Sequence, residues 1–429
     1  MAAGESVLRD CRTWPRFAPV TLDHPRASPG VAARAARGAV LWLADGLCRR
    51  AGLRVGARVA VTVGSRRLAG LGALLRQLVG LLRARGFDVF LLPAMGSHGG
   101  ATPSGRREVL AALGVTPRSA GAPILDCARM VLVGKTPWGR RVFAHPLALA
   151  AEAVVLLGRV RSHPSFDGEI QSGLLKMLAV GIGGPEGSAE VHRHGAVGIE
   201  PAVIDMSRAL ARRLPLAGGL ATVEDAAGEL AAVEPCGGRW EEVRAVEARC
   251  LALARHLEPS LPIDDLDLLL VDRMGKDIAG TGMDTRVIGR RRVWEYPEPE
   301  RPRVRRLVVF RLTAASAGNA NGIGLADFTT ARLARDIDWP KTLKNALTTT
   351  FTQRAALPPV LPNDREAVRA ALESLHLEDW RRVRALRLSD TRRLDRVWVS
   401  EALSAYFPEA HGPWRPLPFG PDGNLLDLA

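Results

Sequence analysis

Side chains that transfer protons, form covalent bonds or bind metals are concentrated on two glycine-rich segments of this chain. The first, residues 159–195 (RVRSHPSFDGEIQSGLLKMLAVGIGGPEGSAEVHRHG), holds three of the nine histidines and one of only five lysines. The second, residues 93–102 (PAMGSHGGAT), places one histidine among three glycines. Scarce reactive side chains on such backbone are typical of an active site. The candidates are His98, His163, Lys176 and His192.

Two of these histidines suit acid/base chemistry near neutral pH. Gly99 and Gly100 follow His98, and glycine lets the backbone pass close to a ligand. His163 precedes Pro164, which favours extended backbone at the histidine. The alternatives are a turn histidine bonded to the backbone for His98, and a capping or core histidine for His163.

Lys176 lies in the short apolar segment SGLLKMLAV, residues 172–180. A lysine in apolar surroundings loses its charge and becomes nucleophilic. We therefore expect a site of covalent attachment for a cofactor or substrate. The alternative is a lysine at a helix edge whose amine reaches solvent.

A glycine-rich run, residues 181–187 (GIGGPEG), resembles a phosphate-binding loop with Gly183 and Gly184 at its centre. It matches neither the P-loop nor the dinucleotide fingerprint. His192 and His194 follow and would share one side of a strand. One of them could ligate a metal through imidazole, and we expect His194 to be the one that faces solvent.

The elements that would position these residues alternate between strand, glycine loop and helix. Apolar runs predict strands and helical spacing predicts helices, with Gly86 ending one helix and Thr102 capping the next. The expected strands are residues 57–63, 87–93 and 154–157, and the expected helices are residues 38–53 and 68–85. This alternation predicts a parallel α/β sheet. Ligands bind beyond the carboxyl ends of such strands, so we expect Arg66, His98 and residues 159–163 to converge.

A second alternating block follows the proline-flanked break at residues 259–262. The expected strands there are residues 267–271 and 307–312. A glycine-rich loop, residues 272–284, carries Lys276, although turn glycines and side-chain caps would explain most of its positions. We predict two α/β domains with parallel-rich sheets, residues 1–258 and residues 259–429, and an active-site cleft between them.

The composition excludes several classes of protein. Hydrophobic residues make up 47% and charged residues 24% of the 429 residues, as in soluble globular proteins. The net charge is +14, but 54 of the 59 basic residues are arginines spread along the chain, so we predict no nucleic-acid partner. No apolar run would span a bilayer and the start lacks a signal-peptide core, so we expect a cytoplasmic protein without a membrane partner. Five scattered cysteines favour reduced thiols over a disulfide framework or an iron–sulfur cluster.

Three motifs, PAMGSHGGAT, SGLLKM with its flanking histidines, and GKDIAGTGMD, together resemble the lactate-racemase-like family. That family consists of nickel-pincer nucleotide-dependent isomerases, and the resemblance spans residues 61–364. It implies a pyridinium-3,5-bisthiocarboxylate mononucleotide carrying nickel, held by a lysine through a thioamide, with a histidine as nickel ligand. It also implies cofactor-synthesis proteins as partners.

The family pattern assigns roles to individual residues. Lys176 matches the tethering lysine, and His192, 16 residues later, matches the nickel ligand. His98 and His163 match the two acid/base histidines. The resemblance further implies Arg66 and Lys276 at substrate, with Arg66 also at a phosphate. Gly99, Gly100, Gly183 and Gly184 are expected to bring backbone close to the cofactor, because glycine allows close approach.

The chain departs from the racemases in two places. The segment VTVGSR that ends at Arg66 has no acidic residue, whereas the racemases have Asp-Asp-x-Thr-Arg there. The spacing from His163 to Lys176 is also longer than in the racemases. The identity of the substrate therefore stays open.

Inversion of a 2-hydroxy acid requires that a hydrogen leave carbon and return to the opposite face. The proton on that carbon is too weakly acidic for a histidine base, so hydride transfer to and from the cofactor, with two histidine acid/bases, solves the problem. We predict a racemase or epimerase of a 2-hydroxy acid or a related hydroxylated compound. The alternatives are a non-catalytic nucleotide- or metal-binding carrier of the same fold, and an NAD-type dehydrogenase, which would lack its G-x-G-x-x-G motif.

Overall fold

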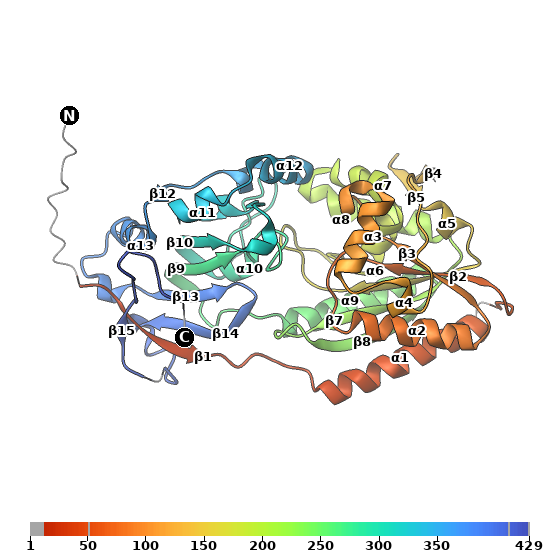
Figure 1. Cartoon of the computed structure of the whole chain (residues 1–429), viewed down its shortest axis with the longest axis horizontal. Helices are drawn as coiled ribbons and strands as arrows, with labels where there is room; N and C mark the ends of the chain where they lie inside the picture. Colours follow the sequence, from red (N-terminus) through yellow and green to blue (C-terminus); the bar gives the residue numbers. More distant parts are fainter. Residues whose placement is uncertain (1–12, 50–51, 411, 428–429) are drawn as a thin grey trace. The chain divides into compact units, whose positions relative to one another are not determined.

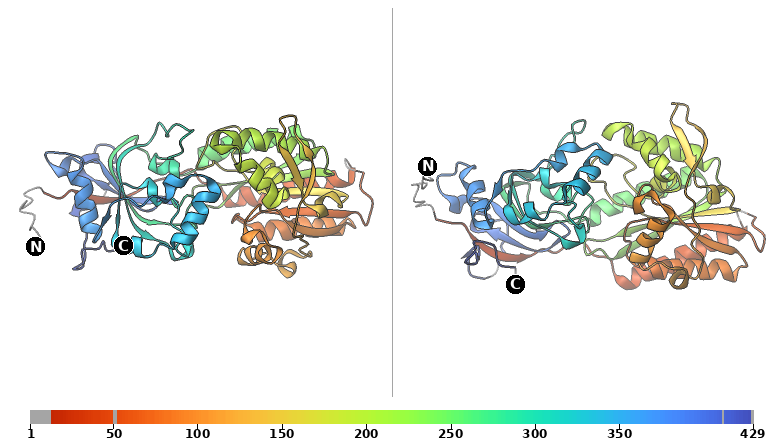
Figure 2. Two further views of the ribbon diagram at one scale, coloured as in Figure 1. Left: turned by 90° about the horizontal axis from the view of Figure 1, so that it is seen from above. Right: turned by 45° about the horizontal axis from the view of Figure 1, so that its top comes forward.

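The computed structural model describes residues 13–49, 52–410 and 412–427, and the chain divides into two compact units (Figures 1 and 2). One unit is His24–Glu258, and the other joins residues up to Asp23 with the segment from Pro259 onward. Each unit is built on a sheet with parallel central strands and flanking helices. The predicted α/β class is therefore confirmed.

The unit His24–Glu258 contains a five-stranded sheet in the order β3-β2-β6-β7-β8. The first four strands are parallel to their neighbours, and β8 returns antiparallel to β7. Its strands are β2 (Arg58–Val63), β3 (Asp88–Pro93), β6 (Ala153–Arg159), β7 (Leu216–Glu224) and β8 (Leu230–Gly237). A separate antiparallel hairpin is formed by β4 (Val131–Lys135) and β5 (Arg141–Ala144).

Helices of this unit are α1 (Pro29–Arg49), α2 (Leu71–Ala84), α3 (Pro103–Ala112), α4 (Pro117–Ala120), α5 (Pro146–Leu149), α6 (Leu174–Lys176), α7 (Gly184–His192), α8 (Gly195–Ala211) and α9 (Trp240–Leu257). Two sequence signals are confirmed at their ends. Gly86 follows α2 with φ of 84°, a left-handed value that suits glycine. Thr102 caps α3, because its side chain accepts a hydrogen bond from the amide of Gly105 at 3.1 Å.

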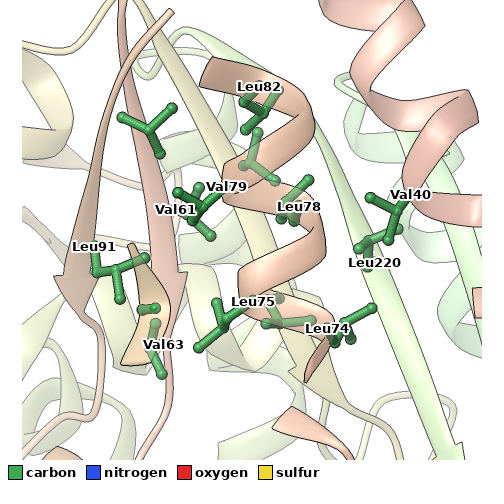
Figure 3. Close-up of a cluster of buried hydrophobic side chains, with 14 of the residues drawn as sticks. Val40, Val61, Val63, Leu74, Leu75, Leu78, Val79, Leu82, Leu91 and Leu220 are labelled. Carbon is green, nitrogen blue, oxygen red and sulfur yellow. The ribbon is translucent and has the colours of Figure 1, made fainter. Parts of the chain in front are cut away.

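A hydrophobic core lies between α2 and one face of this sheet (Figure 3). Successive side chains of a strand point to opposite faces, so Val61 and Val63 of β2 reach the same core. Leu75 and Leu78 of α2 are fully buried there because the apolar residues of the helix recur at helical spacing. This packing fixes β2 and β3, and with them the loops at their carboxyl ends.

The second unit is an eight-stranded sheet in the order β12-β11-β10-β9-β13-β14-β1-β15. Its strands are β1 (Arg16–Thr21), β9 (Asp265–Met274), β10 (Arg303–Leu312), β11 (Phe328–Thr330), β12 (Val360–Leu361), β13 (Ala385–Asp390), β14 (Arg393–Ser400) and β15 (Arg415–Pro416). Its helices are α10 (Thr285–Ile288), α11 (Ala331–Arg335), α12 (Trp339–Thr349) and α13 (Asp364–Glu373). Strand β9 is apolar on both faces because a core covers each of them.

One boundary of the predicted domains needs correction. The sequence division placed residues 1–258 together, but residues 13–23 belong with the unit that starts at Pro259. The reason is strand pairing, because β1 lies antiparallel to β14, with Phe17 opposite Ser400. The local sequence of β1 does not indicate that it pairs with β14, which lies hundreds of residues later in the chain.

Membrane spans and cysteines can be examined in the described residues. No helix found there combines the length and the apolar character that a bilayer crossing needs. Four cysteines are free thiols, of which Cys236 and Cys250 are buried, Cys127 is half-buried and Cys48 is exposed. Cys11 lies outside the described residues.

Candidate functional site

Three neighbouring strands deliver the predicted site residues to one edge of the sheet in His24–Glu258. Strand β2 pairs in parallel with β3 on one side and with β6 on the other. Arg66 follows β2, His98 follows β3, and His163 follows β6. Because the carboxyl ends of parallel strands lie at the same edge, these three side chains share one end of the sheet.

Lys176 and His192 are carried by one almost continuous helical path across that edge. It runs through α6, a π-helical segment at Met177–Ile182, and α7, which ends at His192. Segments of π-helix are rare and occur frequently at functional sites. Residues 181–187 therefore form the end of the π-helical segment and the first turn of α7, and His192 lies on a helix and not on a strand.

The glycines of that run serve helix packing. A Cβ added at Gly183 would lie 2.2 Å from the carbonyl oxygen of Ala179, and one at Gly184 would lie 2.5 Å from Cγ of Met130. Such approaches are far shorter than a normal contact. The absence of a side chain at Gly183 and Gly184 therefore has a structural cause, and their predicted approach to the cofactor remains a prediction.

Glycines of the sheet bring the start of this helical path close to the strands. Leu174, fully buried, rests beside Gly158 of β6 and Gly219 of β7, and a Cβ at either glycine would lie 3.2 Å from its methyl groups. Any larger side chain would push α6 outward. Gly158 and Gly219 therefore allow α6, and with it Lys176, to lie close to the sheet.

Further contacts hold the π-helical segment over the ends of β2 and β3. Beside Gly64, which follows β2, lies Cε of Met177, 3.2 Å from where a Cβ would be. A Cβ at Gly181 would lie 2.9 Å from the carbonyl oxygen of Ala94, which follows β3. A Cβ at Gly96 of the His98 loop would lie 3.0 Å from Cγ1 of Val180. The loops at the strand ends and the lysine-bearing segment are thus packed together.

Three of the predicted residues, Arg66, His98 and His192, lie within electrostatic range of Lys176. Burial and the charge of Arg66 lower the pKa of Lys176 and Glu247 raises it, and together they leave it at about 8. The surroundings of His98, chiefly desolvation and then the charges of Arg66 and Lys176, lower its pKa to about 4, although the residue keeps an exposed surface. Desolvation and Lys176 likewise lower the pKa of His192 to about 4. At neutral pH both imidazoles are therefore uncharged and keep a lone pair.

Arginines give this edge of the sheet a positive potential. Burial lowers the pKa of Arg66, and the neighbouring charges of Arg159 and Arg161 lower it further. Arg159 also pairs with Glu224 of β7, at 2.6 Å. Arg66 has an exposed surface and lies within range of two further positive charges, so it could bind a carboxylate or phosphate.

His163 is oriented by its own loop and by an aromatic ring. Its Nδ1 accepts a hydrogen bond from the amide of Ser165 at 3.1 Å, so the neutral ring carries its proton on Nε2. Its ring stacks on Phe166, with centroids 4.2 Å apart. Nζ of Lys176 lies 5.8 Å from the centroid of the same phenyl ring. Phe166 therefore links the acid/base candidate to the nucleophile candidate.

Two residues of this site were absent from the sequence prediction. Phe166 is fully buried on the loop after β6, three positions after His163. Glu247 is a fully buried acid on α9 whose Oε2 accepts a hydrogen bond from the amide of Leu175 at 2.9 Å. Phe166 lies in the same motif as His163 and could have been found there, whereas Glu247 resembles any other acidic residue on an amphipathic helix.

The two glycines after His98 differ in their surroundings. A Cβ at Gly99, where φ is 63°, would lie 2.4 Å from the carbonyl carbon of Gly105 in α3. Gly100 has the same φ, but a Cβ there would meet nothing within 4 Å. Gly99 thus packs the histidine loop against α3, and Gly100 alone of this pair leaves open space for a ligand.

Lys276 lies in the other unit, just after β9. Its Nζ donates hydrogen bonds to the carbonyl oxygens of Gly280 at 2.7 Å and Asn321 at 3.4 Å. The side chain is therefore held by two loops of its own unit. Its predicted contact with substrate remains a prediction.

A cluster of potential metal ligands, Asp126, Cys127 and His145, lies elsewhere in His24–Glu258. Nδ1 of His145 accepts a hydrogen bond from the amide of Leu147, so its Nε2 carries the proton and donates to Asp126 at 3.1 Å. Arg106 binds both carboxylate oxygens of Asp126. Burial and the charge of Asp126 raise the pKa of the Cys127 thiol. These groups satisfy one another, so the cluster is a structural network and not a free set of ligands.

Comparisons with known proteins give structural likeness alone. No family model matches the chain, and no curated protein matches it. A structural-genomics protein from Thermotoga maritima is similar over 63% of this chain and 70% of its own, with 15% identity and a TM-score of 0.48. The lactate racemase apoprotein from Thermoanaerobacterium thermosaccharolyticum is similar over 85% of this chain and 91% of its own, with 12% identity and a TM-score of 0.44.

Proposed function

We propose that this chain is a nickel-pincer nucleotide-dependent racemase or epimerase of a 2-hydroxy acid or a related hydroxylated compound. The observation that carries the proposal is the environment of Lys176. The pKa of its amine is lowered to about 8, chiefly by desolvation. The amine lies within electrostatic range of Arg66 and of two neutral imidazoles, His98 and His192. An amine with a lowered pKa is a nucleophile at neutral pH, as a covalent tether requires.

The residues present fit the proposed cofactor. Lys176 would hold it covalently, and the neutral imidazole of His192 has the lone pair that a nickel ligand needs. The arginines at the strand ends, Arg66 among them, would neutralise the phosphate of a nucleotide or the carboxylate of a substrate. When bound, this cofactor would supply the acceptor and donor of hydride.

The protein's own residues would bind the substrate and move its hydroxyl proton. Arg66 would hold the substrate carboxylate through paired N–H bonds. His98, uncharged at neutral pH, would accept the hydroxyl proton directly. Nδ1 of His163 accepts the amide of Ser165, so Nε2–H would donate a hydrogen bond to a substrate oxygen, and the ring would give up a proton only from its doubly protonated form. His98 would thus act as the proton acceptor and His163 as the partner on the other face.

The test is turnover by the chain co-expressed with cofactor-synthesis proteins. A panel of enantiomerically pure 2-hydroxy acids would be followed by chiral chromatography. We expect racemisation of at least one acid, and its loss in His98→Ala and in His163→Ala with the bound nickel retained. His256→Ala is the matched control, since His256 is exposed in the last turn of α9, whereas Nε2 of His194 is buried and does not face solvent as expected. Nickel bound in full without turnover on any acid would instead favour a non-catalytic carrier.

A further inference from the structure

A buried carboxyl group stands at the start of the helical segment that bears Lys176. Glu247 of α9 has no exposed surface, and its Oε2 accepts the amide of Leu175 at 2.9 Å. The amide of Leu174 also bonds to this carboxyl group. Its Oε1 has no hydrogen-bond partner among the described residues. A buried carboxyl group with one oxygen lacking a hydrogen bond destabilises the folded state, so its retention suggests a functional role.

The contact between Glu247 and this segment is close and specific. At Gly173, where φ is 102°, a Cβ would lie 2.8 Å from Cδ of Glu247 and 2.8 Å from Cγ2 of Val160. Only glycine suits both the backbone conformation and the space. The first amides of a helix have no partner within the helix, and the carboxyl group of Glu247 supplies one. The direction in which α6 leaves Gly173, and hence the path of Lys176, depends on this bond.

The charges around the pair come from several elements. Lys176 is acted on by Arg66 after β2, and it acts on His98 after β3 and His192 at the end of α7. Burial and the charge of Arg66 lower the pKa of Lys176, whereas the charge of Glu247 raises it.

The groups that face Glu247 itself are Lys176 and two thiols. The thiols, Cys236 of β8 and Cys250 of α9, have pKa values raised to about 12, chiefly by burial, and are uncharged at neutral pH. The Lys176 ammonium is therefore the cation that acts on the Glu247 carboxylate from within this cluster.

We propose that Glu247 is a positioning residue for Lys176, whose carboxyl group fixes the turn that carries the lysine and supplies the negative charge that governs when the amine loses its proton. This inference rests on the proposed role of Lys176 as the point of attachment. Burial raises the pKa of Glu247 to about 8, so the two groups titrate in the same range and as a coupled pair. Ionisation of Glu247 holds the proton on Lys176, and protonation of Glu247 eases its release.

Competitive labelling of the chain expressed without cofactor-synthesis proteins tests this directly. The protein reacts with acetic anhydride between pH 6 and 10, and mass spectrometry follows each lysine peptide. Only four other lysines exist, Lys135, Lys276, Lys341 and Lys344, and they serve as internal references. In Glu247→Gln an amide oxygen still accepts the backbone bond but carries no charge. The labelling midpoint of Lys176 is expected to fall by about half a pH unit or more, a rise of about threefold in rate below the midpoint.

Two further variants make the result decisive. Glu242→Gln removes an exposed carboxylate from the same helix and is expected to leave the Lys176 curve unchanged. Glu247→Asp keeps the charge, so its midpoint should stay at the wild-type value even where Glu247→Gln folds poorly. Superimposable curves for wild type and Glu247→Gln, or an equal shift in Glu247→Asp, would overturn the proposal. Because no cofactor is present, the labelling result stands apart from any later failure to find a tethered nucleotide.

Discussion

A buried ion pair supports the loop that carries His98, and its removal gives a quantitative prediction. Arg106 of α3 and Asp126 are joined by two hydrogen bonds, of 2.9 and 3.0 Å, with side chains only 2% and 0% exposed. The backbone of Arg106 also packs on Gly99, next to His98. In Asp126→Asn the guanidinium stays charged and buried without its counter-charge. Breaking such a pair costs about 3–5 kcal/mol, a fall in melting temperature of roughly 6–20 °C for a unit of this size.

The assay is differential scanning calorimetry, with the transition of His24–Glu258 assigned by hydrogen exchange of α3 peptides. The matched control is Asp265→Asn in the other unit. Asp265 makes the same paired bonds, here to Arg303, but the guanidinium is 72% exposed. Exposed pairs contribute little, so this variant should melt close to the wild type. If Asp126→Asn melts within about 1 °C of the wild type, the reasoning from burial is refuted.

The pH dependence of the same pair has a definite sign. Burial opposes ionisation of Asp126, but hydrogen bonds from His145 and Arg106 outweigh it and hold the pKa below the usual value. A carboxyl group with a lowered pKa stabilises the folded state above its unfolded pKa, about 3.9, and loses that contribution as the pH falls through the folded value. The melting difference between wild type and Asp126→Asn should therefore be constant at neutral pH and shrink in strong acid. A difference that grows in acid would contradict this sign.

Two further predictions concern the site loop and His192. Gly100→Ala should lower the free energy of unfolding by about 1–2 kcal/mol, because alanine is disfavoured in left-handed backbone. Gly99→Ala adds a steric clash with α3 and should lower the melting temperature more. Equal falls in melting temperature for the two variants would contradict the packing of Gly99 against α3. His192, with a pKa lowered to about 4 chiefly by desolvation, should remain neutral down to pH 5 in 15N imidazole spectra, and a midpoint near 6.5 would refute the desolvation argument. Since the unfolded chain takes up this proton near pH 6.5, His192 should reduce the free energy of unfolding as the pH falls from there toward 4.

Local periodicity was enough to predict the strands and loops that carry the site. The apolar runs at residues 57–63 and 87–93 match β2 and β3 to within one residue, because buried parallel strands are continuously apolar. The helix expected at residues 38–53 in fact begins at Pro29, since its first turns are alanine- and arginine-rich and show little apolar spacing. Apolar periodicity does not detect a helical segment that is made of good helix formers but has no repeating apolar face.

Glycine patterns were a weaker guide because glycine has several causes. Residues 181–187 resemble a phosphate-binding loop, yet Gly183 and Gly184 are small because Ala179 and Met130 approach them closely inside a helical path. Nothing in the local sequence distinguishes a glycine that admits a ligand from one that admits a neighbouring helix. The role of Glu247 could not be predicted for the same reason, because its burial depends on packing against the segment at Leu175, far away in the chain.

The central claim is that Lys176 is the covalent anchor of the cofactor, and intact-peptide mass spectrometry tests it most directly. The chain would be co-expressed with nickel-pincer synthesis proteins, digested under non-reducing conditions and searched for a mass increase on the Lys176 peptide, with Lys176→Arg as control. The account predicts an adduct of nucleotide mass on the wild-type peptide and none in the variant. An unmodified Lys176 in protein that racemises a hydroxy acid at full rate, or undiminished turnover in Lys176→Arg, would contradict it.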